Sequence, residues 1–383
     1  MIAQIKIVLI GNYIPDNQES MLRFAHLLDS AFCNAKVLSE IWWPTVLFGR
    51  YTKTTNNGFG KWLGYFDKYI VFPIILKRRI KHIKKNSADV KFHICDHSNS
   101  PYLKYLPADS TSITCHDVIA IRGALGYSDS FQLASRMGKL LQKWIFHHLK
   151  NIKTIAFVSQ HSLNMFKELL FEAQIPGAHY CVIHNAFNND FIPMDLTKAS
   201  VILARSGICS NIPFLLHVGS GSVRKNRILL LDMLSLLQSN TIINCCFAGE
   251  SLNVELIEYA KKLQIFDKVI SIIKPDHETL VALYSSCAAF IFPSLSEGFG
   301  WPLIEAQACG AVVLASDTAP MPEVSGGAAL HFDPNNAAEF AGGFYTLNNK
   351  ILKDKLILDG FKNSRRFSSA GMIKAYIDLM CLN

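Results

Sequence analysis

Two carboxylates stand on either side of a glycine-rich loop in the C-terminal half of the chain. Glu297 and Glu305 are separated by seven residues within FPSLSEGFGWPLIEAQACGAVVLASD, the segment from Phe292 to Asp317. An ionised carboxylate only accepts hydrogen bonds, and two of them on different parts of the chain suit two parts of one polyhydroxylated ligand. The simpler alternative is one solvated loop residue and one charge on a helix surface.

The residues around this pair predict a strand, a loop, a helix and a second strand. The apolar run 288–292 ends at Pro293, which is typical of a buried strand that feeds a loop. Pro302 has the fixed φ suited to the first helical position, and Gly310 supplies a left-handed stop. Residues 311–315 then read as a second buried strand.

The loop also suits an anion. Backbone N–H groups at a helix start carry partial positive charge and point toward a bound anion. Gly298 and Gly300, on either side of Phe299, would let that anion approach the backbone. The segment therefore predicts a site for a sugar nucleotide.

The pattern E-G-F-G-x-P-x-x-E-A-x-A-x-G, from Glu297 to Gly310, resembles the E-x7-E signature of the retaining nucleotide-sugar glycosyltransferases of glycosyltransferase family 4. The resemblance implies the GT-B fold, with two Rossmann-like doubly wound parallel-sheet domains facing a central cleft. It assigns acceptor binding to the N-terminal domain and donor binding to the C-terminal domain. It also implies retaining, metal-independent transfer with no cofactor, the nucleotide diphosphate sugar being the donor substrate.

The resemblance gives the residues of this loop their expected roles. Glu305 would accept hydrogen bonds from the ribose diol, and Glu297 from hydroxyls of the donor sugar. The amides of Gly298, Phe299 and Gly300 would help to orient that sugar.

A second segment supports a donor site. The strand predicted at 214–218 leads through Gly219 and Ser220 to the basic pair Arg224 and Lys225, and then into a helix. Arginine presents a fixed fork to phosphate oxygens and lysine a mobile point charge, so together they can neutralise a diphosphate in place of a metal ion. The segment resembles the V-G-x-x-x-x-R-K-N segment of the same family. The alternative is an ordinary pair of surface charges at a helix start.

The first half of the chain offers two further candidates. His116 and Asp117 directly follow a predicted strand, where a parallel sheet presents functional groups. They resemble the H-D of many family members, whose histidine reaches the donor sugar; the alternative is a hydrogen-bonded structural pair. Gly11 follows the first strand, in the place of the family's glycine-rich loop, and would contact phosphate or acceptor. The sequence there departs from the fuller G-G pattern.

Length and composition fit the two-domain fold that the resemblance implies. The chain has 383 residues, is 50% hydrophobic and has a mean hydropathy of +0.20, which predicts two domains with large cores. No apolar run approaches the ~20 residues that span a bilayer, and the start lacks the cleavage pattern of a signal peptide. The ten cysteines form no C-x-x-C pair, which favours free thiols in a reducing cytoplasm.

Strand-length apolar runs alternate with helix-length segments in two successive blocks, which predicts parallel sheets covered on both faces. The predicted boundaries are 1–190 for an N-terminal domain and 195–364 for a C-terminal domain, with a helix at 365–383 returning to the first. The polar stretch 188–210 reads as the break between them. The predicted strands cover residues 5–10, 90–95, 112–115, 154–158, 180–183, 214–218, 242–248, 268–272, 289–292 and 312–315.

The net charge of +8 is uneven. Residues 1–190 hold 22 Lys and Arg against 13 Asp and Glu, a net of +9, which leaves 38 − 22 = 16 against 30 − 13 = 17 in the rest. The densest basic segment is Leu76–Lys85, just after an aromatic-rich stretch. Such a segment can lie on an anionic membrane surface or can be a solvated helix face. No recognised motif accompanies it that would favour nucleic acid.

The resemblance, together with the basic first half, implies a transferase that moves a hexosyl group to a glycan or lipid-linked oligosaccharide in bacterial surface polysaccharide synthesis. It would be cytoplasmic, or peripheral on the inner face of the plasma membrane. Two alternatives stay open: an enzyme of the same architecture, such as a sugar-nucleotide epimerase or a pyridoxal-dependent phosphorylase, and a non-catalytic sugar-nucleotide-binding protein.

Overall fold

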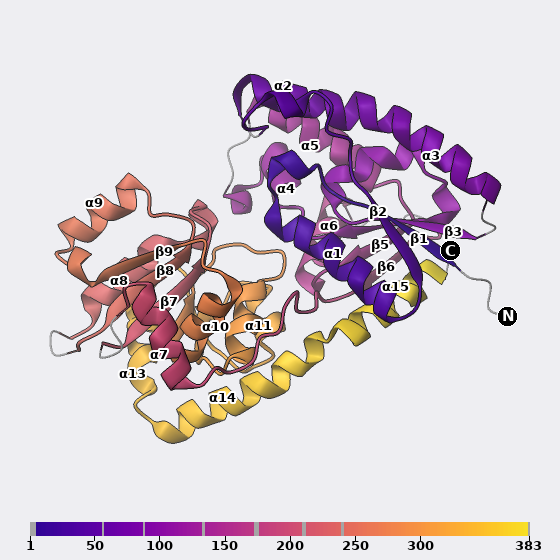
Figure 1. Ribbon diagram of the computed structural model, residues 1–383. Helices are drawn as coiled ribbons and strands as arrows, with labels where there is room; N and C mark the ends of the chain where they lie inside the picture. The colour runs from indigo at the N-terminus through magenta and orange to yellow at the C-terminus, as the bar shows by residue number, and fades with distance from the viewer. Residues whose placement is uncertain are drawn as a thin grey trace. The chain divides into compact units, whose positions relative to one another are not determined.

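The structure is a computed structural model that describes residues 5–55, 57–86, 89–131, 135–171, 176–208, 212–238 and 241–381. The chain divides into two compact units (Figure 1). Unit 1 comprises Met1–Asn188 together with Ser369–Asn383, and unit 2 comprises Asn189–Ser368. Each unit has a parallel sheet of its own with helices on its faces, as the alternation of the sequence predicts.

Unit 1 contains a six-stranded parallel sheet in the order β2-β1-β3-β4-β5-β6. The chain leaves β1 for β2 on one side and then adds the remaining strands on the other, so the topological switch point lies between β1 and β3. Ligands of such sheets bind beyond the carboxyl ends of the strands at this point. The strands are β1 (Lys6–Ile10), β2 (Leu38–Trp42), β3 (Val90–Ile94), β4 (Thr111–Cys115), β5 (Thr154–Phe157) and β6 (His179–Val182).

Helices pack on both faces of this sheet around a core of apolar side chains from β1, β3, β4 and β5. The last helix of the chain belongs to unit 1, where the Tyr376 hydroxyl lies 2.8 Å from Oγ1 of Thr114. The helices are α1 (Glu19–Asn34), α2 (Gly58–Phe66), α3 (Phe72–Asn86), α4 (Ile119–Leu125), α5 (Arg136–Leu149), α6 (Gln160–Leu169) and α15 (Ser369–Cys381), with a π-helical turn, η3 (Asp67–Val71), between α2 and α3.

Unit 2 repeats the arrangement with the strand order β12-β11-β10-β7-β8-β9. Its switch point lies between β7 and β10, which pair through Ala289 with Leu215 and Phe290 with Leu216. The strands are β7 (Phe214–Gly219), β8 (Asn244–Gly249), β9 (Val269–Ile273), β10 (Ala289–Phe292), β11 (Val313–Ser316) and β12 (Leu330–Phe332).

The stretch 188–210, predicted to hold the break between the domains, contains the division between Asn188 and Asn189 and also a helix that the sequence did not indicate. Asp195 caps α7 (Leu196–Arg205) by accepting hydrogen bonds from the amides of Thr197 and Lys198. The other helices of unit 2 are α8 (Arg227–Leu236), α9 (Val254–Lys262), α10 (His277–Ser286), α11 (Trp301–Ala308), α12 (Met321–Ser325), α13 (Ala337–Thr346) and α14 (Lys350–Ser364).

The predictions about the cysteines and about membrane-spanning segments can be compared with the described residues. Their nine cysteines are all free thiols, and five of these are buried, as the scattered spacing indicates. None of the described helices combines the length and the apolar character that crossing a bilayer requires.

Candidate active site

The predicted donor residues meet at the switch point of unit 2. Arg224 and Lys225 follow β7, and Glu297 follows the neighbouring strand β10. Two contacts tie the segments together: the Leu295 amide donates to the Arg224 carbonyl at 2.8 Å, and the Arg224 guanidinium donates to the Ser296 carbonyl at 3.0 Å. Arg224 and Lys225 therefore lie next to Glu297, although they are 73 and 72 positions away from it in the sequence.

Glu297 binds both cations through separate oxygens. Its Oε2 accepts from Nη1 of Arg224 at 2.5 Å and its Oε1 from Nζ of Lys225 at 2.6 Å. Glu297 and Lys225 are 6% and 7% exposed, so neither is the solvated surface charge that the simpler sequence interpretation offered. A carboxylate oxygen has two lone pairs, and this arrangement leaves acceptor capacity for a hydroxyl of a ligand.

The cluster has a distinct electrostatic character. Burial would raise the pKa of Glu297, but the charges of Lys225 and Arg224 outweigh it and lower that pKa to about 2. Burial lowers the pKa of Lys225, and the Glu297 carboxylate opposes that shift. These three side chains carry two cations against one carboxylate, and the Glu305 carboxylate also acts on Lys225, so the attraction for an anionic ligand comes from the charged donors of Arg224 and Lys225 themselves.

Glu305 lies one turn into α11 and is buried. It accepts a hydrogen bond from the buried hydroxyl of Tyr284 on α10 at 3.0 Å. This bond fixes the carboxylate against the neighbouring helix. The residue is therefore a positioned acceptor and not a charge on a helix surface.

Two glycines shape the loop and the helix as the sequence predicts. Gly300 is the N-cap of α11 and has φ of +99°, a left-handed conformation that a residue with a Cβ rarely adopts. A glycine at this position offers no side-chain oxygen to the first amides of the helix. Gly310 follows α11 with φ of +81° and is the predicted stop. The helix begins at Trp301, one residue before Pro302.

The remaining residues of the donor loops take different places. Phe299 is buried and packs its ring edge-on against Phe367, whereas Gly298 is half-buried. Ser220 is exposed in the turn after β7, and the carbonyl of Gly219 accepts from Nη2 of Arg227 at 2.8 Å.

Two residues near this turn were missed in the sequence. Arg227 also donates to the carbonyls of Glu250 and Ser251, so its buried guanidinium clamps the ends of β7 and β8. His217, inside β7, is fully buried, and burial lowers its pKa to about 3. Its Nδ1 faces the Ile291 carbonyl at 3.2 Å and must donate, so its Nε2 is an unprotonated acceptor that has no partner among the described residues. Within an apolar strand pattern, nothing in the sequence indicates that a histidine is fully buried or that one of its ring nitrogens has no partner.

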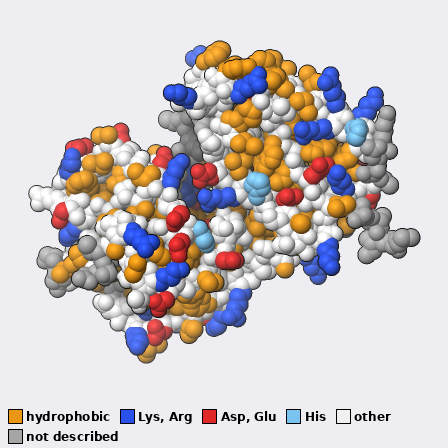
Figure 2. Space-filling view, viewed as in Figure 1, with side chains coloured by type: hydrophobic (Ala, Val, Ile, Leu, Met, Phe, Trp, Pro, Cys, Tyr) orange, Lys and Arg blue, Asp and Glu red, His pale blue; other side chains and the backbone are white. Residues whose placement is uncertain are grey.

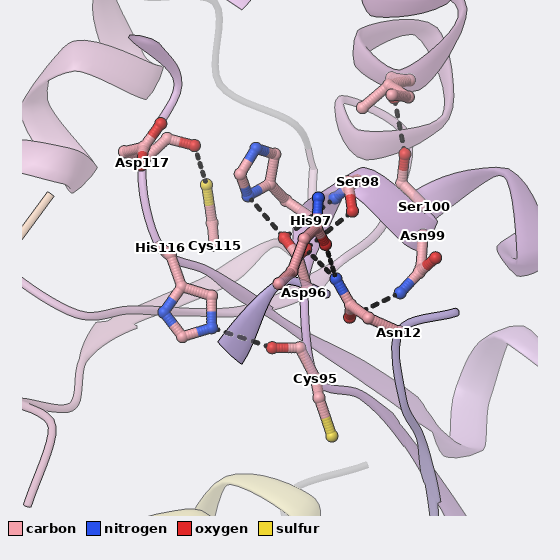
Figure 3. Close-up of polar contacts among 12 residues, drawn as sticks. Asn12, Cys95, Asp96, His97, Ser98, Asn99, Ser100, Cys115, His116 and Asp117 are labelled. Atoms are coloured by element: carbon pink, nitrogen blue, oxygen red, sulfur yellow. Dashed lines mark hydrogen bonds and ion pairs between the residues drawn. The ribbon is translucent and has the colours of Figure 1, made fainter. Parts of the chain in front are cut away.

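A polar network marks the switch point of unit 1 (Figure 3). Asn12, just after β1, donates to Oδ2 of Asp96, just after β3, at 2.6 Å. Asn99 donates to Oδ1 of Asn12 at 2.9 Å, and Ser98 donates to Asp96 at 2.7 Å. Burial opposes ionisation of Asp96, but the adjacent His97 charge holds its pKa well below the usual range. Asp96 and His97 directly follow a predicted strand, whereas no sequence pattern singles out Asn12 or Asn99.

His116 also lies at this edge, after β4, and is buried. Its Nε2 faces the Cys95 carbonyl at 2.9 Å and must donate to it (Figure 3). Burial lowers the pKa of His116, although the Asp96 carboxylate favours the charged form. The neutral ring then has Nδ1 as an acceptor. Asp117 accepts instead from the Ile119 amide at 3.0 Å, so the adjacent pair is not joined through its side chains.

Gly11 is covered by an aromatic ring. A Cβ at this position would lie 2.2 Å from a ring carbon of Trp43, and the Gly11 amide donates to the Trp42 carbonyl at 3.1 Å. The close approach of Trp43 is sufficient reason for a glycine here.

The basic segment Leu76–Lys85 lies on α3 and has one packed face. Leu76, Ile80 and Ile83 are buried, and the side chains of Lys77, Arg78 and Lys81 are exposed. The side chains of Lys84 and Lys85 lie outside the described residues.

Exposed apolar side chains lie just before this segment. Hydrophobic side chains gather along the upper edge of the molecule in Figure 2, where Figure 1 labels α2. We call this group the apolar stripe; its members are Phe59, Trp62, Phe66, Ile70 and Ile74, which are 42–76% exposed. Their spacing of three or four residues places them on one face of the continuous helix from α2 through η3 to α3.

Sequence comparison connects unit 2 to a known family. Residues 202–369 match the family described as "Glycosyl transferases group 1". The chain is 28% identical over 238 residues to O-antigen chain mannosyltransferase B of Escherichia coli, which covers 60% of this chain and 61% of that protein. It is 26% identical over 259 residues to the serotype-specific mannosyltransferase WbdA of E. coli, covering 63% of this chain and 30% of that protein. The chain thus spans less than two thirds of the length of these relatives.

Solved structures resemble the whole chain. Sucrose-phosphate synthase from Thermosynechococcus elongatus superposes with a TM-score of 0.74 at 16% identity, covering 99% of this chain and 100% of that one. Anabaena HepE in complex with UDP and glucose superposes with a TM-score of 0.67 at 15% identity, covering 99% of each chain. Because the sequence identity is only 15–16%, these superpositions support a shared fold and nothing further. The two Rossmann-like units with parallel six-stranded sheets have the GT-B fold that the sequence predicts.

Proposed function

We propose that this chain is a glycosyltransferase that moves a hexosyl group from a nucleotide diphosphate sugar to a glycan or lipid-linked acceptor in bacterial surface polysaccharide synthesis. The observation that carries the proposal is the cluster of Arg224, Lys225 and Glu297 at the switch point of unit 2. The family match of residues 202–369 and the O-antigen mannosyltransferases among the relatives support it. Those relatives make mannosyl nucleotides the first donors to test.

In the proposed chemistry, different residues of unit 2 bind different parts of the donor. Arg224 and Lys225 hold the diphosphate and balance the negative charge that develops as it leaves, without a metal ion. Glu305 accepts from the ribose diol, and Glu297 accepts from a hydroxyl of the sugar while it orients both cations. The backbone at Gly298, Phe299 and Gly300 orients the sugar, and the turn at Gly219 and Ser220 allows the phosphates to approach.

We propose further that the reaction retains the anomeric configuration. The bond between the anomeric carbon and the diphosphate oxygen breaks, and a bond to the acceptor oxygen forms on the same face. The acceptor proton passes to the departing diphosphate oxygen. For His116, in unit 1, the proposed partner is a hydroxyl of the donor sugar, which the acceptor nitrogen Nδ1 suits.

We also propose an anionic membrane surface as a partner. The apolar stripe and the exposed Lys77, Arg78 and Lys81 lie on one continuous helix. Apolar side chains that enter the headgroup region next to lysines and arginines suit an anionic lipid surface, at ~1 kcal/mol for each basic residue near it. The enzyme would then act as a peripheral protein at the inner face of the plasma membrane.

Calorimetric titration with UDP-, GDP- and ADP-sugars, in the presence of a chelator, tests the donor site. We expect one nucleotide class to bind, and we expect Glu305→Gln and Lys225→Met each to weaken that binding at least tenfold, or ~1.4 kcal/mol. Glu255→Gln, an exposed change on α9, serves as the matched control. If both variants bound the nucleotide sugar as tightly as the unchanged protein, the site assignment would be wrong.

Turnover separates the proposal from its alternatives. A labelled donor should yield free nucleoside diphosphate and a labelled glycan product. Recovery of an epimerised sugar would favour the epimerase, an absorbance band of a lysine-bound pyridoxal would favour the phosphorylase, and donor binding without any turnover would favour a non-catalytic protein.

A further inference from the structure

A buried histidine lies where the sheet of unit 2 opens at its switch point. His217 is on β7 and is fully buried. β7 pairs with the neighbouring strand β10 as far as Leu216 with Phe290. At the next position Nδ1 of His217 lies 3.2 Å from the carbonyl oxygen of Ile291, on β10. The imidazole ring therefore takes up a backbone acceptor at the point where the two strands part.

The surroundings of this ring fix its protonation and its orientation. A carbonyl only accepts, so Nδ1 carries the proton and Nε2 is an acceptor. Burial lowers the pKa of His217 to about 3, against the charges of Lys225, Arg227 and Glu297 that also act on it, and the ring is neutral at pH 7. Its edge packs against Phe247, with the ring centroids 6.0 Å apart. The ring thus presents one unprotonated nitrogen in a fixed direction.

That nitrogen lies beside the side chain of Lys225. The point that a Cβ of Gly219 would occupy is 3.5 Å from Nε2 of His217 and also 3.5 Å from Cδ and Cε of Lys225. Because Gly219 has no Cβ, the imidazole and the lysine side chain both border this point. Nζ is one bond beyond Cε, so rotation about the last torsion of the lysine moves the ammonium group while the backbone stays in place. The ammonium group is therefore the donor that this arrangement offers to Nε2.

Lys225 has unused hydrogen-bonding capacity. An ammonium group carries three N–H donors. One of them donates to Oε1 of Glu297 at 2.6 Å, and the part of the chain that the structure describes provides no second acceptor for this group. The residue is only 7% exposed, so bulk water has little access to it. Two N–H groups thus remain for a ligand and for His217.

The bond to Ile291 does not by itself account for a histidine at this position. Burial removes both ring nitrogens from water, and Nε2 has no hydrogen-bond partner among the described residues. A buried acceptor without a donor costs free energy. A second state of the site, in which Nε2 does receive a hydrogen bond, would explain why this acceptor is present.

We propose that His217 positions Lys225 when the donor binds. In the complex the ammonium group turns so that one N–H donates to Nε2 of His217, one to Glu297 and the third to a diphosphate oxygen. A neutral acceptor suits this place, because a further carboxylate would repel the diphosphate. His217 acts on the diphosphate only through Lys225, and this role rests on the proposed transferase function.

NMR of the full-length protein, with nitrogen-15 in its histidines, tests the contact directly. The ring of His217 is assigned through its contact with Phe247, and UDP, GDP and ADP are added in turn. We expect saturation with the diphosphate that binds to shift the Nε2 resonance upfield, as happens when an unprotonated ring nitrogen accepts a hydrogen bond. Lys225→Met, saturated at a higher concentration, should not show this shift.

Two variants separate the roles of the two ring nitrogens. His217→Asn keeps an amide donor near the place of Nδ1 for Ile291 but offers no acceptor to Lys225. His217→Gln has its amide near the place of Nε2, where the oxygen can accept from Lys225, and it gives up the bond to Ile291. We expect His217→Asn to weaken binding of the nucleoside diphosphate at least about tenfold, the effect of one hydrogen bond to a charged group, and His217→Gln no more than about threefold.

Transfer assays and a control complete the comparison. His217→Asn should raise the donor KM and leave the acceptor KM unchanged, which a general loss of structure would not do. His179→Asn, an exposed change on β6 in unit 1, should alter neither constant. Circular dichroism melts check that each variant is folded, and the NMR comparison of the unchanged protein with Lys225→Met decides if a variant at position 217 is not.

The outcomes distinguish this role from the proposed function. If a nucleoside diphosphate binds while the Nε2 resonance stays in place, or shifts equally in Lys225→Met, the role of His217 is wrong and the transferase function is untouched. Weaker binding by His217→Gln than by His217→Asn would also overturn the role, because it would assign the effect to the bond with Ile291. If none of the three diphosphates bound, the proposed function and this role would both be wrong.

Discussion

The ammonium group of Lys225 lies 2.6 Å from Oε1 of Glu297, and both side chains are buried. The two residues come from the segments after β7 and β10, the strands on either side of the switch point. Because the second oxygen of Glu297 binds Arg224, one carboxylate sets the position of both cations proposed to receive the diphosphate. Glu297 therefore has a structural role that can be tested separately from any contact with the sugar.

Removing the charge of Glu297 should destabilise the fold as well as the site. Glu297→Gln leaves the ammonium group of Lys225 buried without a charged partner, which typically costs ~3–5 kcal/mol. Chemical denaturation should show this loss in the free energy of unfolding. Glu258→Gln removes an exposed partner of Lys261 and should cost no more than ~1 kcal/mol. Equal costs for the two variants would contradict a buried ion pair.

Acid should weaken the protein through the same carboxylate. The pKa of Glu297 falls from 4.5 to about 2 on folding, so its stabilising contribution is complete above pH 4.5 and is lost as the pH falls toward 2. The shift corresponds to about 3 kcal/mol at neutral pH. Unfolding free energies measured from pH 6 to pH 2 should fall less steeply for Glu297→Gln than for the unchanged protein. Parallel curves would show that Glu297 does not titrate in this way.

Replacement of His116 should impair transfer without impairing nucleotide binding. His116→Phe keeps a ring against Phe24, whose centroid is 4.6 Å away, but removes the Nδ1 acceptor and the bond to Cys95. We expect kcat to fall at least about tenfold, the effect of one hydrogen bond, and the nucleotide Kd to stay constant. Because burial lowers the pKa of His116, kcat of the unchanged enzyme should show no change caused by titration of this residue between pH 6.5 and 8. An inflection there that the variant abolishes would contradict a neutral imidazole.

The glycine at the start of α11 should not tolerate a side chain. Gly300→Ala places a Cβ at φ of +99° and 3.3 Å from the Phe292 ring, which we expect to cost ~1–2 kcal/mol and to weaken donor binding. Gly342→Ala, within α13 and with open space around the new methyl group, should instead stabilise by ~0.5–1 kcal/mol. Thermal unfolding of both variants measures the contrast.

Liposome co-sedimentation examines the membrane surface. Vesicles containing anionic lipid should retain the protein, and neutral vesicles should retain less of it. Replacing Trp62 and Phe66 of the apolar stripe by serine should release the protein, as should neutralising Lys77, Arg78 and Lys81 together. A double change of Ile351 and Leu358, exposed residues of α14 in unit 2, is the matched control. Retention that is the same in every variant would refute this membrane surface.

Two of the four edge strands show where local pattern fails. The predicted strands all correspond to strands of the structure; most are central, buried on both faces and visible as apolar runs, and β6 and β9 at sheet edges were also predicted. The strands β2 and β12, at the other two edges, were missed. β12 has only three residues, and Ser39 and Glu40 interrupt the apolar pattern of β2. The helix α7 was missed in a stretch whose polar flanks obscured its periodicity.

By itself, the sequence determined two α/β units and the local form of the donor loop: a strand ending at Phe292, a left-handed Gly300, and a helix stopped by Gly310. These features follow from the covalent preferences of glycine and proline and from continuous apolar runs, which are local. Only the tertiary structure decided that Glu297 pairs with Arg224 and Lys225, and that Asn12 bonds to Asp96. Such pairs form because strands distant in sequence are neighbours at a switch point, and strand order is set by the packing of whole sheets rather than by any single segment.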